Sequence, residues 1–123
     1  MQSQVDYSYV LTGSRSKLPQ IKNRISNIAN RCTHFYIGLT NHPERRFADH
    51  VRKGLANWDR MVVLYQTLSA RKEGDFEDEL IAYYRESKYA SKLINSPLSG
   101  GREGRMSEPP YYIYMLVEVF QQL

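Results

Sequence analysis

Side chains that suit chemistry on phosphate occur close together between residues 36 and 50. The stretch begins with Tyr36-Ile37-Gly38, and Arg46 and His50 follow it, four residues apart. The planar guanidinium of arginine can form two parallel hydrogen bonds to phosphate oxygens, which favours Arg46 as a phosphate clamp. Hydrolysis of a phosphodiester also requires an activated water and stabilisation of the charge that develops on the phosphate. The residue types in this stretch are therefore those that phosphodiester hydrolysis needs.

A carboxylate that could hold a metal ion lies further along the chain, in Glu77-Asp78-Glu79-Leu80-Ile81. Mg²⁺ keeps most of its waters and is commonly held by one or two carboxylates together with substrate phosphates. A single glutamate is therefore sufficient, and we expect Glu77 to hold Mg²⁺ or Mn²⁺, with Glu79 as the alternative ligand. A tyrosine, with an ordinary pKa of about 10, is a poor base at neutral pH. Tyr36 therefore needs either a lowered pKa or a role in orienting water.

The pattern of apolar residues predicts strands and helices that would position these groups. Strands are expected at 5–11, 33–40, 60–68 and 111–119, helices at 43–54 and 75–86, and a loop at 95–104. We expect the first two strands to pair antiparallel across an inserted segment. The predicted fold class is α/β, of the α+β type, with a small central antiparallel β-sheet flanked by helices in a single domain over residues 1–123.

The helix predicted at 43–54 carries two of the candidate side chains. Pro43 suits the first turn of a helix, and Gly54 marks its end. An apolar stripe is formed by Phe47, Val51 and Leu55. A second face beside this stripe carries Arg46, His50 and Lys53 at positions i, i+4 and i+7, so we expect these three side chains to point the same way.

The net charge of +4 over 123 residues arises from one local excess of basic residues. The segment 13–31 contains no acid and five cations, Arg15, Lys17, Lys22, Arg24 and Arg31. Leu18, Ile21, Ile25 and Ile28 recur in it at helical spacing, which predicts a short helix beginning near Pro19. Such a segment suits a polyanion, because neutralising phosphates releases counterions. We expect nucleic acid rather than a membrane as the partner, since the apolar residues are too few for a strong interfacial helix.

Two further features bear on where the protein acts. No apolar run approaches the roughly 18 residues that a membrane span needs, and the first residues lack the character of a secretory signal. The single cysteine, Cys32, excludes an internal disulfide framework and a cysteine-rich zinc site, and we expect it to be a small buried side chain. We therefore expect a non-exported, cytoplasmic protein without a membrane partner.

The stretch around Tyr36 resembles a known family. Tyr36-Ile37-Gly38, with Thr40, Arg46 and His50 at the family's spacing, resembles the second half of the GIY-YIG nuclease motif and the helix that follows it. The first half is normally Gly-Ile-Tyr followed by a variable and an aliphatic residue. Tyr9-Val10-Leu11-Thr12 is similar to that stretch, and Tyr7 is the alternative for its tyrosine. The basic segment 13–31 would then be a long insertion between the two motif strands.

The resemblance implies a metal-dependent DNA endonuclease. It assigns catalytic roles to Tyr9, Tyr36, Arg46, His50, Glu77 and Asn95, the last of which precedes Gly100-Gly101 as an asparagine does in the family. Glu77 would be the metal ligand, and Tyr9 and Tyr36 would together activate water and contact phosphate. DNA would be held by Arg45 and Lys53 and by the five cations of segment 13–31. Double-stranded DNA is the expected substrate, with a homodimer where both strands are cut.

Three functions from different classes follow from the sequence. The first is this endonuclease, of the restriction or phage type, acting in the cytoplasm of a bacterium or of a phage's host. The second is a nucleic-acid-binding module of the same fold that has lost cleavage. The third is a protein-interaction domain, which failure to bind any DNA or RNA would favour.

Overall fold

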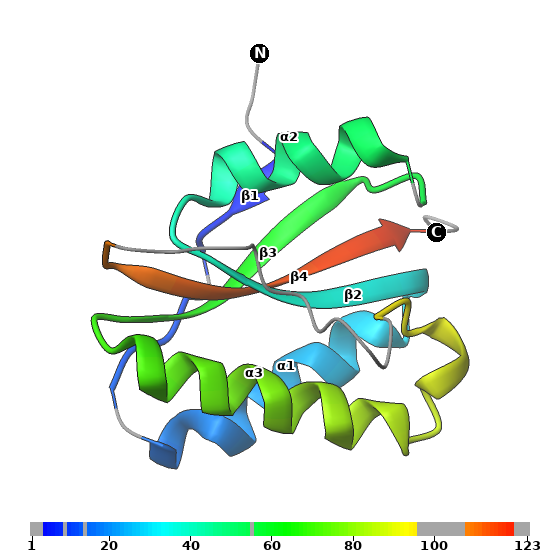
Figure 1. Cartoon of the computed structure of the whole chain (residues 1–123). Helices are drawn as coiled ribbons and strands as arrows, with labels where there is room; N and C mark the ends of the chain where they lie inside the picture. The colour runs from blue at the N-terminus through cyan, green and yellow to red at the C-terminus, as the bar shows by residue number, and fades with distance from the viewer. Residues whose placement is uncertain (1–3, 9, 14, 55, 96–107, 120–123) are drawn as a thin grey trace.

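Four strands form one mixed sheet in the order β1-β3-β4-β2, and helices cover both of its faces (Figure 1). The computed structural model describes residues 4–8, 10–13, 15–54, 56–95 and 108–119. The strands are β1 (Val5–Asp6), β2 (Cys32–Thr40), β3 (Arg60–Thr67) and β4 (Tyr111–Val119). The predicted α+β class is confirmed. The sheet is mixed rather than wholly antiparallel, because β1 runs parallel to β3.

The expected antiparallel pairing of residues 5–11 with residues 33–40 is wrong. Strand β2 pairs instead with β4, from Cys32 opposite Val119 to Thr40 opposite Tyr112. On the other side of β2, the backbone N–H of Ile94 donates to the carbonyl oxygen of Phe35 at 2.9 Å. Neighbours on both sides of β2 therefore leave its edges no room for the N-terminal segment.

The N-terminal segment lies at the opposite edge of the sheet, beside β3. Among its described residues it forms a regular strand only at β1, where Val5 lies opposite Met61. Leu11 then forms an isolated parallel bridge to Tyr65. In place of the strand predicted at 5–11, the described residues pair with β3 at two short places. Neither place pairs with β2.

Helices α1 (Leu18–Ala29) and α3 (Ala70–Arg85) cover one face of the sheet, and α2 (Pro43–Lys53) covers the other (Figure 1). Helix α1 confirms the helix predicted near Pro19, and short 3₁₀ helices lie at Arg15–Lys17 and Ala90–Lys92. Helix α2 ends at Gly54, whose φ of +70° is a left-handed conformation that glycine adopts readily. Helix α3 begins earlier than predicted, at Ala70. None of the described helices combines the length and apolar character that crossing a membrane requires.

Each face of the sheet has its own core. The core shared with α1 and α3 includes Ile21, Ile25, Phe35, Leu80 and Tyr84, all fully buried. The core beneath α2 is more aromatic and includes Tyr36, Phe47, Trp58 and Tyr114. The candidate chemical residues of α2 therefore face aromatic side chains of the sheet.

The buried face of α2 differs from the predicted apolar stripe. Phe47 is buried, but Val51 is 50% exposed, and the helix buries Arg46 and His50 instead. Lys53, at the last turn, is exposed. Polar side chains can be buried in this position because they find hydrogen-bond partners on the sheet. Leu55, the third residue of the predicted stripe, lies outside the described residues.

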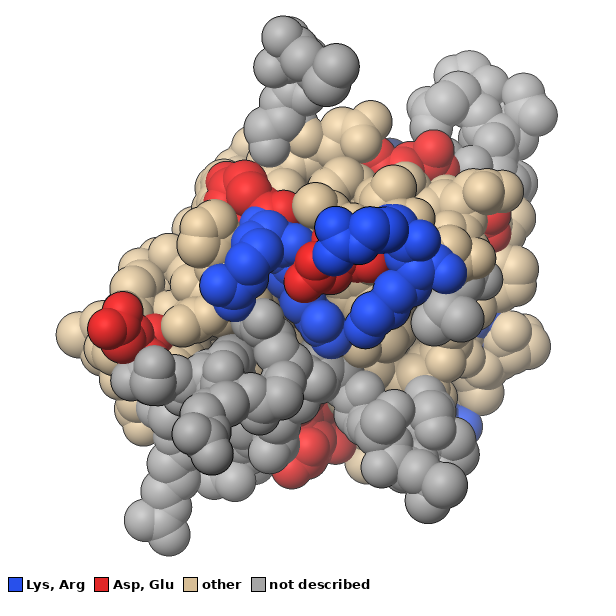
Figure 2. Space-filling model, turned by 45° about the horizontal axis from the view of Figure 1, so that its top comes forward, with Lys and Arg blue, Asp and Glu red and all other residues tan. Residues whose placement is uncertain are grey.

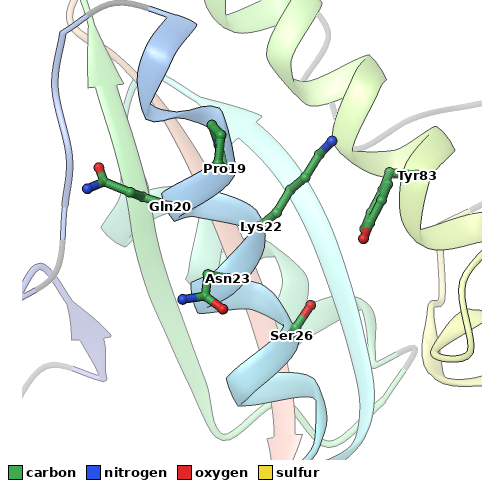
Figure 3. A pocket seen from close by; sticks show the side chains of 6 residues that line it. All are labelled: Pro19, Gln20, Lys22, Asn23, Ser26 and Tyr83. Atoms are coloured by element: carbon green, nitrogen blue, oxygen red, sulfur yellow. The ribbon is translucent and has the colours of Figure 1, made fainter.

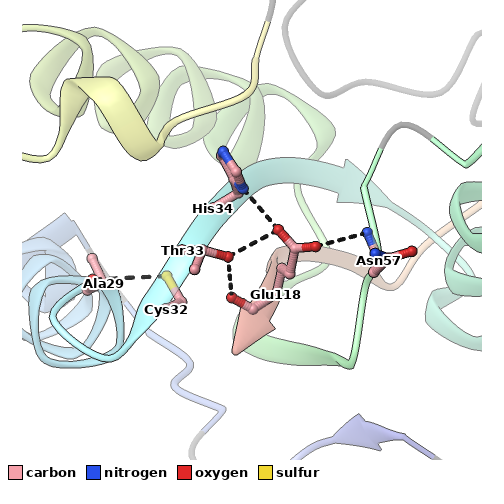
Figure 4. A network of polar contacts seen from close by, with 6 residues as sticks. All are labelled: Ala29, Cys32, Thr33, His34, Asn57 and Glu118. Atoms are coloured by element: carbon pink, nitrogen blue, oxygen red, sulfur yellow. Dashed lines mark hydrogen bonds and ion pairs between the residues drawn. The ribbon is translucent and has the colours of Figure 1, made fainter. Parts of the chain in front are cut away.

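A polar network joins the start of β2 to the end of β4 (Figure 4). The hydroxyl of Thr33 donates to the carboxylate and to the carbonyl oxygen of Glu118, at 2.9 and 3.0 Å, and His34 Nδ1 lies 2.7 Å from Glu118 Oε1. The bond with His34 is the main cause that lowers the pKa of Glu118 below its ordinary value. The backbone N–H of Asn57 donates to the other carboxylate oxygen at 3.2 Å, so Glu118 also fixes the loop before β3.

Cys32 lies at the beginning of β2 and is only 1% exposed. Its thiol donates a weak hydrogen bond to the carbonyl oxygen of Ala29, with an Sγ to oxygen distance of 3.7 Å. Burial raises the pKa of the thiol to about 11, so the reactive thiolate is disfavoured. Cys32 is the small buried side chain that the sequence predicts.

Candidate active site

Both candidate side chains of α2 form hydrogen bonds with the hydroxyl of Tyr114. His50 Nε2 lies 2.8 Å from the Tyr114 oxygen, and Arg46 Nε donates to the same oxygen at 3.4 Å. Tyr114 is fully buried, and Arg46 and His50 are only 9% and 4% exposed. Because 46 and 50 are one helical turn apart, both side chains reach one point on β4. The sequence predicts Arg46 and His50 as site residues, but Tyr114 is new.

Tyr36 completes the aromatic part of the site. Its ring stacks on that of Tyr114, with centroids 6.3 Å apart and an angle of 25° between the planes. Its centroid also lies 4.7 Å from that of the His50 ring, in an edge-to-face arrangement. Tyr114 lies opposite Gly38 in the antiparallel ladder, so Tyr36 is its diagonal neighbour on the same face of the sheet. Two tyrosines on neighbouring strands thus meet under α2.

Glu77 of α3 acts on this group through its charge, although α3 covers the other face of the sheet. Its side chain is fully buried, and its charge helps to raise the pKa of both Tyr36 and Tyr114. The other acids of the motif, Asp78 and Glu79, are more accessible to solvent. We call Tyr36, Arg46, His50, Glu77 and Tyr114 the Tyr114 cluster. Four of its five members are predicted from the sequence as site residues.

Both tyrosines of the Tyr114 cluster hold their protons more tightly than a free phenol. Burial is the main cause that raises the pKa of Tyr36, and burial also raises the pKa of Tyr114 well above its ordinary value. The positive charge of Arg46 acts in the opposite direction on both and is not sufficient to offset it. The two hydroxyls are therefore neutral near pH 7.

Asn95 fixes the position of the strand that carries Tyr36. Its side-chain Oδ1 accepts from the N–H of Ile37 and its Nδ2 donates to the carbonyl oxygen of Ile37, both at 2.8 Å. The amide thus forms the two backbone hydrogen bonds with Ile37, the residue between Tyr36 and Gly38, that a neighbouring strand would form. Asn95 is 6% exposed. The sequence assigns it to catalysis, and the geometry makes it a positioning residue for β2.

Thr40 has a related role at the start of α2. Its hydroxyl oxygen accepts from the backbone N–H of His42 at 3.0 Å, and His42 Nδ1 in turn accepts from the N–H of Arg45 at 3.3 Å. These bonds satisfy backbone donors at the beginning of the helix. They also set the direction in which α2 leaves β2 and carries Arg46 back over Tyr36.

Of the two candidates for the first motif tyrosine, the structure describes only Tyr7. Tyr9 lies outside the described residues. Tyr7 is 39% exposed, and its hydroxyl donates to Glu44 Oε2 at 2.7 Å. Its ring meets that of Tyr112 edge to face, with centroids 6.4 Å apart. The tyrosine stacked on Tyr36 is Tyr114.

A sequence signal for Tyr114 was present in Tyr112-Ile113-Tyr114-Met115-Leu116. These residues match the pattern of isoleucine, tyrosine, variable and aliphatic residue, with Tyr112 in the place of the first glycine. They also pair antiparallel with Tyr36-Ile37-Gly38. The signal is missed when the first half of the motif is sought only before the second half.

The basic residues predicted to bind DNA divide between two faces of the molecule. Lys17, Lys22, Arg24 and Arg31 lie on or next to α1, whereas Arg45 and Lys53 lie on α2. Figure 2 shows Lys and Arg side chains gathered around acidic ones on the surface over α2. The side chain of Arg15 lies outside the described residues. Arg24 lies close enough to Asp6 for its charge to help lower the pKa of that acid.

The residues of the Tyr114 cluster fit a magnesium ion but not a metal cage. In the described part of the chain, no three His, Cys, Asp or Glu side chains form a group that could hold a metal. One carboxylate, Glu77, lies close enough to the two neutral phenols for its charge to raise their pKa. This donor set agrees with Mg²⁺ or Mn²⁺ held by a single protein carboxylate and the substrate's own phosphate.

Comparison of the chain with protein-family models, with curated proteins and with solved structures found no match.

Proposed function

We propose that the protein is a metal-dependent endonuclease that hydrolyses phosphodiester bonds of double-stranded DNA at the Tyr114 cluster. One observation carries the proposal: β2, α2, α3 and β4 each contribute to one buried group of two tyrosines, an arginine, a histidine and a glutamate. Buried ionisable groups that share hydrogen bonds are costly to assemble, and they occur preferentially at functional sites. The residue types are those that phosphodiester hydrolysis requires.

Each side chain has a separate task in this proposal. Arg46 binds the phosphate and stabilises the charge that develops on it. The neutral hydroxyls of Tyr36 and Tyr114 orient the attacking water. His50 Nε2, at 2.8 Å, accepts the Tyr114 proton when Tyr114 takes one from that water. This transfer avoids an isolated tyrosinate, which burial disfavours.

Glu77 would hold Mg²⁺ or Mn²⁺, which when bound would neutralise part of the phosphate charge. A cation bound there would also add positive charge beside a carboxylate that is fully buried. Arg46 can supply part of this charge before the cation binds.

The proposed relation to GIY-YIG nucleases involves a change in the order of the strands. Tyr36-Ile37-Gly38 keeps its place before Arg46 and His50, and Glu77 keeps its place in the following helix. The strand that supplies the second tyrosine follows them, at 111–119, and does not precede them. Residues 13–31 are then part of an N-terminal extension with its own helix, and not an insertion between the two motif strands.

A plasmid assay tests the proposal. Supercoiled DNA incubated with the protein and Mg²⁺ or Mn²⁺ should be nicked or linearised, and Glu77→Gln should abolish this without loss of DNA binding. Glu79→Gln, which removes the same charge one half-turn away, is the matched control and should cleave like the wild type. Cleavage that survives Glu77→Gln and is lost in Glu79→Gln would move the metal ligand to Glu79.

A second candidate function is a nucleic-acid-binding module that does not cleave. The complete burial of Glu77 favours it, because a metal ligand must be reached by both cation and substrate. Folded wild-type protein that binds DNA but leaves several forms of it intact with Mg²⁺ and with Mn²⁺ would establish this alternative.

We further propose that the protein acts in a reducing compartment such as the bacterial cytoplasm, since Cys32 is a buried free thiol. One Tyr114 cluster cuts one strand, so a double-strand break would need a homodimer or two successive events. The ratio of nicked to linear plasmid during the reaction distinguishes these routes.

A further inference from the structure

Helix α1 exposes a row of uncharged amides on the side opposite its buried face. Leu18, Ile21, Ile25 and Ala29 face the core. The outer side carries Gln20, Asn23 and Asn27, at spacings of three and four residues, and all three are exposed. Because residues at these spacings are neighbours on a helix, the amides form one stripe along its outer surface.

Asparagine is a poor choice for an exposed helix position when only helix stability is considered. Its helix propensity is among the lower values, because its side chain competes for backbone hydrogen bonds. Asn30 has a structural explanation, since its Oδ1 accepts from the Tyr89 hydroxyl at 3.0 Å. No such bond is found in the described part of the chain for Asn23, Asn27 or Gln20. When residues of low helix propensity occupy a helix without a structural benefit such as a hydrogen bond, a functional role is indicated.

The flanks of this stripe are basic. Lys17 precedes α1, Lys22 lies within it and Arg31 follows it, and segment 13–31 contains no acid. Lys22 extends toward Tyr83 of α3, with Nζ 4.3 Å from the ring centroid, whereas Gln20 and Asn23 extend from the other side of the helix (Figure 3). An open pocket of about 490 Å³ lies here, and all three of these α1 side chains and Tyr83 line it. The stripe and one flank are therefore accessible to a large partner.

We infer that α1 is a reading helix that enters the major groove of double-stranded DNA. The carboxamides of Gln20, Asn23 and Asn27 contact base edges, and the flanking cations contact phosphates. The major groove of B-form DNA is wide enough for a helix, and amides form two hydrogen bonds to adenine there. The deep groove of double-stranded RNA is too narrow for side chains to read. This inference rests on the DNA partner of the proposed function but not on cleavage.

The test uses full-length protein carrying Glu77→Gln, so that DNA is bound and not cut. Selection from randomised short duplexes should recover a motif that contains adenine. Replacing Gln20, Asn23 and Asn27 together by Ala should then reduce affinity for the selected duplex by roughly tenfold or more for each amide that pairs with a base. Affinity for unselected DNA and the dependence on salt should change little, because the cations that bind phosphate are kept.

Two controls keep the result interpretable. The triple variant should melt at a higher temperature than its parent, since alanine is the better helix former, so lost specificity cannot come from unfolding. Asn57→Ala, which removes an exposed amide far from α1 in the sequence, should keep the selected motif.

The other outcomes each overturn the inference. Salt-dependent binding without a recovered motif means that α1 contacts only the DNA backbone. A motif that survives in the triple variant places base recognition elsewhere. Absence of binding to any DNA at low salt removes both this inference and the DNA partner, whereas a failed plasmid assay alone removes only cleavage.

Discussion

The hydroxyl of Tyr114 is the point where the candidate site is assembled. It bonds to two side chains of α2, and its ring stacks on Tyr36. Because burial raises the pKa of both phenols, each acts as a neutral hydrogen-bonding group near pH 7. Removing one hydroxyl therefore removes hydrogen bonds, and with Tyr114 the proposed proton transfer, but no charge.

Replacing Tyr114 by Phe is expected to lower the rate of DNA cleavage by about 10²-fold or more, because His50 and Arg46 lose their shared oxygen. Initial rates of plasmid nicking at saturating DNA measure the effect. Tyr7→Phe is the matched control, since this substitution also removes one phenolic hydroxyl that donates a hydrogen bond. The Tyr7→Phe protein should cleave at nearly the wild-type rate. Equal losses in the two variants would contradict the role of Tyr114.

Asn95→Asp tests the positioning of Tyr36. The acceptor for the Ile37 N–H is kept, but the donor is replaced by a carboxylate oxygen that faces the Ile37 carbonyl. The variant should be less stable by about 1–3 kcal/mol in urea unfolding, because a buried bond is replaced by repulsion. The fluorescence of Trp58, whose ring lies 6.3 Å from that of Tyr36, should also change in the folded variant. Wild-type stability together with unchanged fluorescence would contradict this role.

At the scale of elements, the helices could be predicted from local patterns. The spacing of Leu18, Ile21 and Ile25 places α1, and Pro43 and Gly54 mark the ends of α2 closely. These signals are local, because helical hydrogen bonds join residues four apart. The buried face of α2 could not be predicted in this way, since it depends on Tyr114, which is distant in sequence.

Strand pairing was the part of the fold that local patterns could not settle. The residues at 5–11 have strand propensity whichever neighbour they take, and the pattern does not distinguish β2 from β3. The pairing of β2 with β4, each nine residues long, joins the middle of the chain to its C-terminal region. For the same reason, the cluster residues on β2, α2 and α3 were found from their spacing, whereas the partner tyrosine on β4 was missed, because its strand was not expected to pair with β2.

The contact between α1 and α3 should weaken at alkaline pH. The hydroxyl of fully buried Tyr84 donates to the carbonyl oxygen of Lys22 at 2.6 Å and lies 2.8 Å from Ser26 Oγ. Burial raises the pKa of Tyr84 to about 12. The unfolded chain ionises this group near its ordinary pKa of about 10, so its contribution to stability is complete below that pH. It is lost as the pH rises from about 10 to about 12.

Urea unfolding between pH 8 and the alkaline limit measures this loss, which should reach about 2 kcal/mol for Tyr84. Tyr84→Phe should be less stable than the wild type at pH 8, and its stability should fall less steeply above pH 10. Tyr83→Phe is the matched control, because Tyr83 is 48% exposed, and the variant should follow the wild-type profile. Parallel profiles for Tyr84→Phe and the wild type would contradict the assignment.

For the whole molecule, the two basic helices lie on opposite faces of the sheet (Figure 1). Helix α2 exposes Arg45, Arg52 and Lys53, although Arg52 also forms an ion pair with Asp49. Helix α1 carries Lys22 beside its amide stripe, and Lys17 immediately precedes it. Duplex DNA is stiff over its persistence length of about 150 base pairs. One short straight duplex can therefore lie against α1 or α2, but not both.

This arrangement predicts that one chain binds two short duplexes at low salt. With excess DNA and the Glu77→Gln protein, sedimentation should give a saturating stoichiometry, the limit, of two duplexes per chain. Replacing Lys17, Lys22 and Arg31 by Gln should reduce the limit to one, because the α1 surface no longer neutralises phosphates. The slope of log affinity against log salt for that surface should flatten by nearly one for each cation that had bound a phosphate. Replacing Arg45, Arg52 and Lys53 instead should also leave one duplex, bound through α1 and retaining the selected sequence.

A limit of one duplex in the parent protein would mean that the two faces do not bind DNA independently, and the variant that abolishes binding would then identify the helix that holds it.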